Sequence, residues 1–365
     1  MKTKLQYLFI TLALFAGVHP APAQLTNLGI ALAGNQSILF WPTTITNYVL
    51  QSTTNLALPN WVTVSDAVPV IAVTVTNTSP ARFFRLFQTN GPAGMGFIPA
   101  GSFTMGNSIG DVDFTDASNV TVNVSAFYMD VNLVSSNQWR SVYAYATNHG
   151  YRFVHVGDCK AANHPVQFVD WYDCVKWCNA RSQQAGLTPM YYTDAGLTQV
   201  FTNGEGTPYV NWAAKGYRLP TEAEWEKAAR GGLSGQRFPW GNAISETNAN
   251  YFSSLAFDAF DSGPSGYNAT YATPPYPYTS PVGSFAANGY GLYDMAGNVY
   301  EWCWDWYGTP YAGGSDPRGP ASGTDRVFRG GCWIDRAGYA RCAYRSHYYP
   351  TLGVYRNGFR CVKGL

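Results

Sequence analysis

Apolar and polar residues alternate with a period of two between residues 25 and 89. Five short runs carry this alternation and are separated by Asn, Pro, Ser and Thr: 37–41, 48–52, 61–64, 70–75 and 82–87. Such runs are typical of β-strands, and their spacing predicts a small all-β sandwich module. The segment has no His or Cys and hardly an acid. Because active sites need convergent ionisable groups, we expect a structural or adhesive role for it.

Two later segments show the helical period of 3.6 residues instead. The first covers 137–148, with Ser136 as N-cap and Gly150 as its end, and its apolar face consists of Trp139, Val142, Tyr143 and Ala146. The second begins after the N-cap Asp170 and ends at Gly186. Its buried stripe consists of Trp171, Cys174, Val175 and Cys178.

A third helix has the clearest signals. Thr221 and Glu224 form a T-x-x-E capping box, Gly231 ends the helix, and the inward face consists of Trp225, Ala228 and Ala229. Short strands, turns and long loops fill the rest, including a Pro- and Tyr-rich loop over 264–281. The pattern predicts an irregular α+β domain over 95–365, joined to the β module (25–89) by a linker at 90–94.

Composition places the chain among exported proteins. Only 12% of its 365 residues are charged, whereas 16% are aromatic and 37 are glycine, as is typical of a rigid, loop-rich extracellular domain. Lys2 and Lys4 precede an apolar run at 5–18, and small residues lie before Gln24. This predicts a signal peptide at 1–23, an uncleaved anchor being the alternative, and a secreted, periplasmic or cell-surface location. We expect no transmembrane segment after cleavage.

Net charge limits the classes of partner that the chain can bind, and the cysteine count limits how its thiols can pair. The net charge of +1, without a long run of one sign, argues against binding nucleic acid. All seven cysteines lie beyond residue 158. In an oxidising compartment, an odd number leaves at least one thiol free or paired between chains. The pairing of five of them stays open: Cys159, Cys174, Cys303, Cys332 and Cys342.

Seven blocks follow one another in the second domain. They are FIPAGSFTMG (97–106), HPVQFVDW (164–171), RLPTEAEWEKAARGG (218–232), PWGN (239–242), NGYGLYDMAGNVYEW (288–302), RVFRGG (326–331) and GFRC (358–361). In this order they resemble the formylglycine-generating enzyme, or sulfatase-modifying factor, family. The resemblance implies a C-type-lectin-like α+β fold with little regular secondary structure.

The segment that carries catalysis in the active relatives differs here. Those relatives oxidise a substrate cysteine with two cysteines of their own. In GCWIDRAGYARCAYRS (331–346), Asp335 stands in the position of the first, and the second falls in a deletion. The catalytic candidates are Cys332, Asp335 and Arg345. Cys332 is either a relocated redox thiol, whose pKa Arg329, Arg336, Arg341 and Arg345 would lower, or a buried structural cysteine.

The resemblance also implies metal sites. Carboxylates of Asp294 and Glu301, with carbonyl oxygens of Gly297 and Val299, match a structural Ca²⁺ site, and hard oxygen ligands suit that ion. The alternative is a polar turn. A second calcium site would use Asn250 and Tyr251, with Asp258 or Asp261 in place of a missing acid.

Copper or iron is the other cofactor that we considered. Copper would bind thiols, and some relatives hold iron with histidines. His149, His155 and His164 fall within sixteen residues, but without the H-x-x-x-H spacing or a facial triad. We therefore interpret each of them as a structural histidine.

The resemblance pairs Cys178 with Cys361 in a disulfide, worth about 4 kcal/mol in the chain-entropy model.

The resemblance also implies a recognition surface, because bacterial variable proteins use this fold to display ligand-binding residues in the C-terminal region. The candidates are Trp333, Arg336, Tyr339, His347, Tyr348 and Tyr349, unless this Tyr-rich segment simply packs on the domain. Two interpretations stay open: an oxidoreductase that modifies a protein or peptide side chain through an altered site, and a non-catalytic binder of a protein, peptide or glycan.

Overall fold

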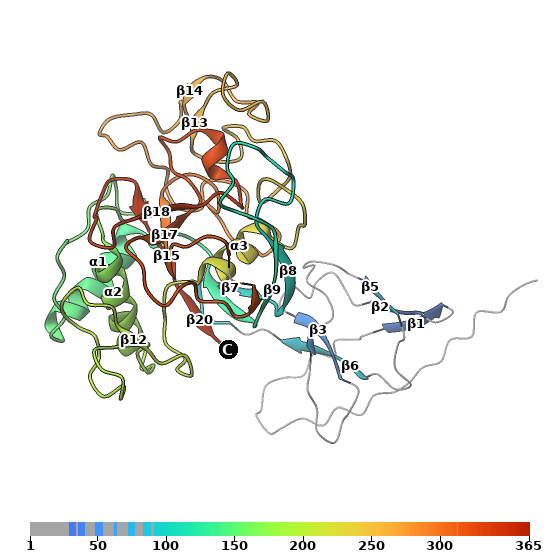
Figure 1. The fold of residues 1–365 in the computed structure, drawn as a ribbon, viewed down its shortest axis with the longest axis horizontal. Coiled ribbons are helices and arrows are strands. Elements are labelled where there is room, and N and C mark those ends of the chain that lie inside the picture. The colour runs from blue at the N-terminus through green and yellow to red at the C-terminus, as the bar shows by residue number, and fades with distance from the viewer. Residues whose placement is uncertain are drawn as a thin grey trace, which may run out of the picture. The chain divides into compact units, whose positions relative to one another are not determined.

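The computed structural model describes residues 91–365 except Ala312, and only the strands of the part before residue 91 (Figure 1). The predicted signal peptide lies outside the described residues. The chain divides into two compact units, Met1–Asn90 and Gly91–Leu365. Among the described residues, no helix has the length and apolar character needed to span a bilayer.

The first unit contains two three-stranded antiparallel sheets, ordered β1-β2-β5 and β4-β3-β6. Their strands are β1 (Gly29–Ala33), β2 (Gln36–Phe40), β3 (Tyr48–Thr53), β4 (Val62–Thr63), β5 (Ala72–Thr76) and β6 (Phe83–Gln88). All five runs predicted from the alternation coincide with strands to within two residues. We did not predict β1, because its sequence GIALA has small and apolar residues but no polar alternation.

The three predicted helices of the second unit are present. They are α1 (Ser136–Asn148), α2 (Trp171–Gln184) and α3 (Glu222–Arg230). Asp170 caps α2, and the Thr221/Glu224 capping box opens α3, which ends at Gly231 in the left-handed conformation. The cap of α1 is Ser135, not Ser136. Two adjacent serines give the same local signal, so the sequence does not distinguish them.

The second unit has fourteen short strands among its described residues. They are β7 (Met95–Ile98), β8 (Gly101–Met105), β9 (Val120–Val124), β10 (Phe127–Asp130), β11 (Tyr191–Tyr192), β12 (Tyr209–Val210), β13 (Phe252–Ser253), β14 (Gly266–Tyr267), β15 (Tyr300–Trp306), β16 (Gly314–Ser315), β17 (Arg326–Arg329), β18 (Ser346–Tyr348), β19 (Asn357–Gly358) and β20 (Val362–Gly364). The largest sheet has the order β18-β17-β15-β19, and β20-β10-β7 and β16-β9-β8 form two others. The α+β prediction with little regular structure is confirmed.

The sheet that contains β15 and β17 has a helical layer on each face. Trp302 and Phe328 pack with α1 and α2, whereas their strand neighbours Cys303 and Val327 pack with α3. Successive side chains of a strand point to opposite faces, so each strand contributes to both cores. Figure 1 shows α1 and α2 on one side of these strands and α3 on the other. This sheet fixes the segment after β17, where the candidate site lies.

Candidate functional site

Strand β17 ends in the turn Gly330-Gly331, which positions Cys332. Gly331 has φ 72°, and a Cβ there would lie 2.9 Å from the carbonyl carbon and oxygen of Tyr339. The turn therefore needs glycine. Beyond it, Cys332 is buried, and its thiol donates a hydrogen bond to Asp335 Oδ2 at 3.1 Å. Asp335 is half-buried, and its charge adds to burial in raising the pKa of the Tyr300 hydroxyl.

This environment disfavours a reactive thiolate. Burial raises the pKa of the Cys332 thiol well above its usual value, and the charge of Asp335 raises it further. Of the arginines, Arg356 acts in the opposite direction, but its effect is smaller. The expectation that neighbouring arginines lower this pKa is wrong. A thiol that keeps its proton is a poor nucleophile and a poor metal ligand.

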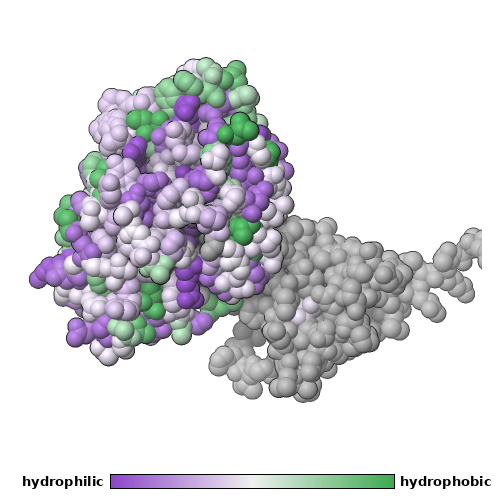
Figure 2. Space-filling view, viewed as in Figure 1, coloured by the Kyte–Doolittle hydropathy of each residue, from purple (hydrophilic) through white to green (hydrophobic). Residues whose placement is uncertain are grey.

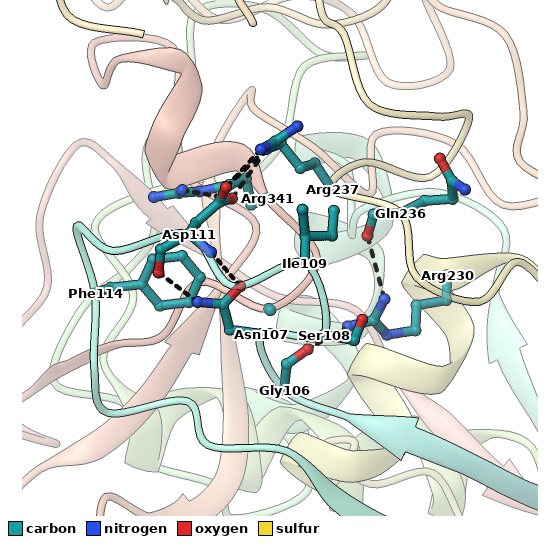
Figure 3. A pocket seen from close by; sticks show the side chains of 11 residues that line it. Gly106, Asn107, Ser108, Ile109, Asp111, Phe114, Arg230, Gln236, Arg237 and Arg341 are labelled. Atoms are coloured by element: carbon teal, nitrogen blue, oxygen red, sulfur yellow. Dashed lines mark hydrogen bonds and ion pairs between the residues drawn. The ribbon is translucent and has the colours of Figure 1, made fainter. Parts of the chain in front are cut away.

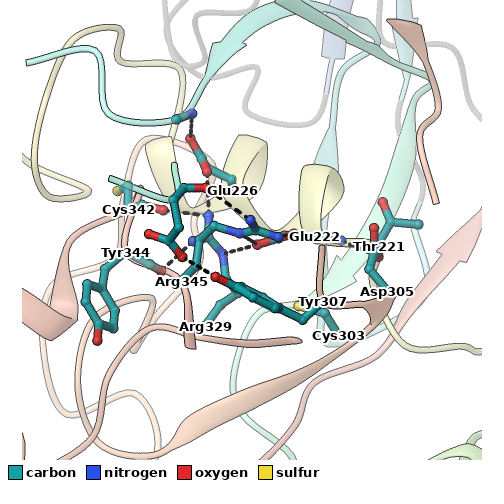
Figure 4. A network of polar contacts seen from close by, with 12 residues as sticks. Thr221, Glu222, Glu226, Cys303, Asp305, Tyr307, Arg329, Cys342, Tyr344 and Arg345 are labelled. Carbon is teal, nitrogen blue, oxygen red and sulfur yellow. Dashed lines mark hydrogen bonds and ion pairs between the residues drawn. The ribbon is translucent and has the colours of Figure 1, made fainter. Parts of the chain in front are cut away.

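Three of those arginines, Arg329, Arg341 and Arg345, are held by carboxylates instead. Both carboxylate oxygens of Glu222 accept hydrogen bonds from Arg345 at 2.7 Å, and Arg329 pairs with Glu226 (Figure 4). Arg230 adds a 2.7 Å ion pair to Glu226. Arg345 is thus part of a buried network that joins α3 to the segment after β17. Its guanidinium donates to Glu222 and to the carbonyl oxygens of Asp116 and Gly308.

The network also contains a carboxylate without an arginine of its own. Asp305 is buried and accepts a hydrogen bond from the backbone N–H of Glu222 at 2.8 Å. Burial, followed by the charge of Glu222, raises the pKa of Asp305 to about 8. This residue therefore holds a proton at neutral pH.

A small hollow lies beside this network, between the loop after β8 and the end of α3 (Figure 3). Its charged lining residues are paired. Arg237 and Arg341 both bind Asp111, at 2.6 and 2.9 Å, and Arg341 also binds Asp113. Arg230, at its inner wall, donates to the carbonyl oxygen of Gln236. The hollow thus offers little free charge to a ligand.

An aromatic cluster surrounds Trp333, the residue next to Cys332. Four tyrosine rings lie 4.9–6.1 Å from the Trp333 ring, namely Tyr267, Tyr276, Tyr278 and Tyr355. Trp333 itself is completely buried, so its predicted place on an exposed recognition surface is wrong. Tyr276, in contrast, is 52% exposed. We did not predict the tyrosines at 267, 276 and 278; the repeated Pro-Tyr pattern of 274–278 was the available signal.

The other predicted surface residues lie in two places. His347 and Tyr348 belong to β18, where His347 Nδ1 lies 2.6 Å from Asp325 Oδ2. Tyr349 follows and is 62% exposed. Arg336 stacks its guanidinium 4.4 Å from the ring centre of Phe257, and Tyr339, half-buried, packs on Tyr344.

The loop predicted to bind calcium has one oxygen without a partner. Asp294 is buried; its Oδ2 accepts the N–H of Gly283 at 2.7 Å, but its Oδ1 has no hydrogen-bond partner. Burial raises the pKa of Asp294 to about 6. Both oxygens of Glu301 accept hydrogen bonds from Arg360, at 2.6 and 2.8 Å, although each has further acceptor capacity. The orphaned Asp294 oxygen is the kind of hard ligand that Ca²⁺ uses.

At the second predicted calcium site, Asp258 and Asp261, the acids proposed to replace the missing ligand, accept hydrogen bonds from protein groups. Asp261 accepts hydrogen bonds from the Tyr251 hydroxyl and from the backbone N–H groups of Ser254 and Gly263. Asp258 accepts the N–H of Gly338. Asn250 donates its side-chain amide to the carbonyl of Tyr278. These contacts hold the loop together through protein donors, and the second calcium site stays a prediction.

The cysteine pair implied by the resemblance is brought together. The sulfur atoms of Cys178, on α2, and Cys361 lie 3.5 Å apart in the core, although no bond joins them. Cys303 and Cys342 lie in the core around α3, buried among apolar side chains.

Comparisons with known proteins agree with this architecture. Residues 83–365 match the family described as "Sulfatase-modifying factor enzyme 1-like domain". The formylglycine-generating enzyme of Thermomonospora curvata is 35% identical over 295 residues, covering 74% of this chain and 93% of the enzyme. Serine/threonine-protein kinase pkn1 of Chlamydia caviae is 34% identical over 282 residues, and this chain spans only 38% of the kinase.

A solved structure gives the same result for the fold. Treponema denticola variable protein 1 superimposes with a TM-score of 0.58 at 30% identity, covering 74% of this chain and 95% of that protein. A family match over more than half of the chain and an enzyme relative at 35% identity lead to one conclusion. The chain belongs to the formylglycine-generating enzyme, or sulfatase-modifying factor, family.

Proposed function

We propose that this chain is a ligand-binding member of its family, not a cysteine oxidase, and that it binds a protein or glycan at the aromatic surface around Trp333. The observation that carries the proposal is the state of Cys332. It is the thiol that follows the Gly-Gly turn, and it is buried, hydrogen-bonded to Asp335, and has a raised pKa. Oxidation of a substrate cysteine would need an accessible thiolate at this position.

The donor atoms beside Cys332 also do not fit a redox metal. Copper in the active relatives requires thiolates, and here one protonated thiol lies beside one carboxylate. Among the described residues, three side chains of the metal-binding types His, Cys, Asp and Glu lie close enough to share an ion. They are His155, Asp170 and Asp173, and Cys332 is not one of them. We therefore derive no oxygen-dependent step at this position.

The aromatic surface supports the binding role. Tyr276 and Tyr267 are 52% and 36% exposed, and the Tyr276 ring packs edge-on against Tyr355 with 5.3 Å between the ring centres. Rigid tyrosines with polar ends provide contact area with little loss of side-chain entropy, as binding loops do. Leu255 and Phe257 are also exposed, and Figure 2 shows apolar patches over the β13–β14 region at the top of the view.

Two measurements test the proposal. The purified chain is incubated with copper, oxygen and a Cys-x-Pro-x-Arg peptide, and we expect no aldehyde. The same chain is applied to glycan and peptide arrays, where we expect a selective ligand whose affinity falls at least tenfold in Tyr276→Ala. Tyr209→Ala is the matched control, because Tyr209 is 51% exposed but lies on β12.

The second candidate is the oxidoreductase with an altered site. It rests on the position of Cys332 directly after the Gly330-Gly331 turn, in the segment that carries catalysis in the active relatives. Aldehyde formation that Cys332→Ser abolishes would establish it and would overturn the binding proposal. An equal loss of array binding in Tyr276→Ala and in the control Tyr209→Ala would also contradict the proposed binding surface, because Tyr209 lies outside it.

We further propose export, a Cys178–Cys361 disulfide and a structural calcium ion at Asp294. The N-terminal charge and apolar pattern support export, and the 3.5 Å sulfur separation supports the bond. The orphaned Asp294 Oδ1 supports the calcium ion. Intact mass of exported protein, with and without reductant, tests the first two together. A mass that corresponds to a chain beginning at Met1 would contradict signal-peptide cleavage. A mass that does not increase by two hydrogens on reduction would contradict the disulfide.

A further inference from the structure

The N-terminus of α2 carries a group of side chains that the proposed function does not use. His155 Nδ1, Asp170 and Asp173 each offer one ligand atom, and these atoms lie within 4.8 Å of one another. His155 Nδ1 forms a hydrogen bond with Asp173 Oδ2 at 3.0 Å and lies 3.6 Å from Asp170 Oδ2. A metal ion would replace the proton of that hydrogen bond. The sequence separates the histidine from the acids by fifteen residues or more, so only the fold brings them together.

One oxygen of this group has no hydrogen-bond partner. Asp170 is completely buried, and its Oδ1 caps α2 by accepting the N–H of Asp173 at 2.6 Å. Its Oδ2 faces His155 and accepts no hydrogen bond. A buried carboxylate oxygen without a donor is costly, because it has lost its water and gained nothing in return. A ligand that neutralises it would remove this cost.

The remaining contacts define the charge of the group. Asp173 accepts the backbone N–H groups of Val154 and His155, each at 2.9 Å, and its Oδ1 lies 3.0 Å from Lys176 Nζ. The group therefore has two acidic side chains and one basic one, and the Asp170 Oδ2 oxygen has no donor. Such an excess of carboxylate oxygens favours a cation.

The spacing of the ligand atoms suits a transition metal. Bonds of about 2.1 Å in tetrahedral or octahedral geometry place neighbouring ligand atoms roughly 3.0–3.4 Å apart, close to the 3.0 and 3.6 Å found here. Imidazole nitrogen with carboxylate oxygen favours zinc, manganese, cobalt or iron over calcium and magnesium. The His155 side chain is 29% exposed, so an ion can enter and keep water in its open positions.

The histidine ring is also fixed in place. A Cβ at Gly353 would lie 2.9 Å from Cδ2 and Nε2 of His155, so glycine is required for the loop to pack on the imidazole. This contact orients Nδ1 towards the two carboxylates, as the surroundings of a metal-binding histidine generally do.

We propose that His155, Asp170 and Asp173 form a binding site for a divalent first-row transition metal ion. The site is separate from the Asp294 loop and from Cys332, and the proposal does not rest on the ligand-binding function. It changes our interpretation of His155, whose sequence spacing indicated a structural role.

The experiment uses the full chain after removal of metals, with Ca²⁺ present to saturate the Asp294 loop. Co²⁺ is titrated while visible absorption and heat are recorded. We expect one equivalent to bind with d–d absorption bands of a nitrogen- and oxygen-ligated ion, and Zn²⁺ to displace it. Melting temperature should rise as Co²⁺ is added, because the ion binds only the folded state.

Two variants and one control locate the ion. Asp170→Asn keeps the helix cap, since Asn caps as well as Asp, and His155→Gln removes the nitrogen ligand. Each should weaken Co²⁺ binding at least tenfold. His149→Gln should bind like the wild type, because His149 is exposed and bonded to the Tyr145 carbonyl. No uptake by the wild type, or equal uptake by all four proteins, would overturn the proposal.

Discussion

Two regions of this domain bury several carboxylates, and they treat them in opposite ways. Beside α3, Glu222 and Glu226 are matched by Arg345, Arg329 and Arg230. At the start of α2, Asp170 has an oxygen without any donor, and burial followed by the charge of Asp173 raises the pKa of Asp170 to about 7. Paired charges hold architecture together, whereas an unpaired buried charge indicates a missing partner.

The largest effect is expected where pairing is complete. Glu226→Gln would leave the buried Arg329 and Arg230 without their partner carboxylate. We expect the free energy of unfolding to fall by about 3–5 kcal/mol, because a buried charge would lose its compensation. Urea denaturation measures this change. Glu205→Gln, at an exposed acid, should change it by less than about 0.5 kcal/mol, and a similar loss in both variants would contradict the comparison.

The calcium proposal extends the contrast to a third carboxylate. Asp294 resembles Asp170 in having one orphaned oxygen. The stability of the folded domain should therefore depend on a cation bound at Asp294. We expect chelation to lower the free energy of unfolding by about 3 kcal/mol relative to a solution with calcium at a hundred times its dissociation constant. Thermal unfolding with EDTA and with added Ca²⁺ tests it. An unchanged melting temperature, with no calcium found by elemental analysis, would exclude the site.

Asp305 sharpens the comparison, because it lies in the paired region without an arginine of its own. Its pKa is about 8 in the folded chain, above its ordinary value of 3.8. The folded state therefore binds the proton more tightly. The stability that this proton gives is complete below about pH 4 and is lost as pH rises through 8.

We expect Asp305→Asn, which keeps the acceptor for the Glu222 N–H, to become more stable relative to wild type by roughly 1 kcal/mol per pH unit between pH 6 and 8. Denaturation at several pH values gives this difference. A difference that stays constant with pH would show that Asp305 is already ionised at pH 6.

Local signals in the sequence were sufficient for the three helices and for five strands of the first unit, whereas the short strands of the second unit were not placed by residue. Asp170, Thr221 and Glu224 act within one helical turn, so their capping roles can be recognised without knowing the fold. The partners of Arg345 and His155 could not be predicted in this way. Glu222 is 123 residues from Arg345, and only the packed sheet brings them together.

The family resemblance predicted the fold and the Cys178–Cys361 proximity, but the candidate site needed the coordinates. Burial decides between an accessible and an inert Cys332, and neither spacing nor composition encodes it. Trp333 illustrates the same limit. The sequence shows an aromatic residue beside the expected cleft, whereas the structure shows four tyrosines around it.

The smallest expected effect is at Asp170, and it is the most direct test of the contrast. Without added metal, Asp170→Asn removes an unpaired buried charge while retaining the cap, so we expect the free energy of unfolding to stay within about 1 kcal/mol of wild type or to rise. With Co²⁺ present, only the wild type should gain stability. A loss of several kcal/mol in the metal-free variant would mean that Asp170 is a structural partner like Glu226. The two regions would then differ in geometry but not in role.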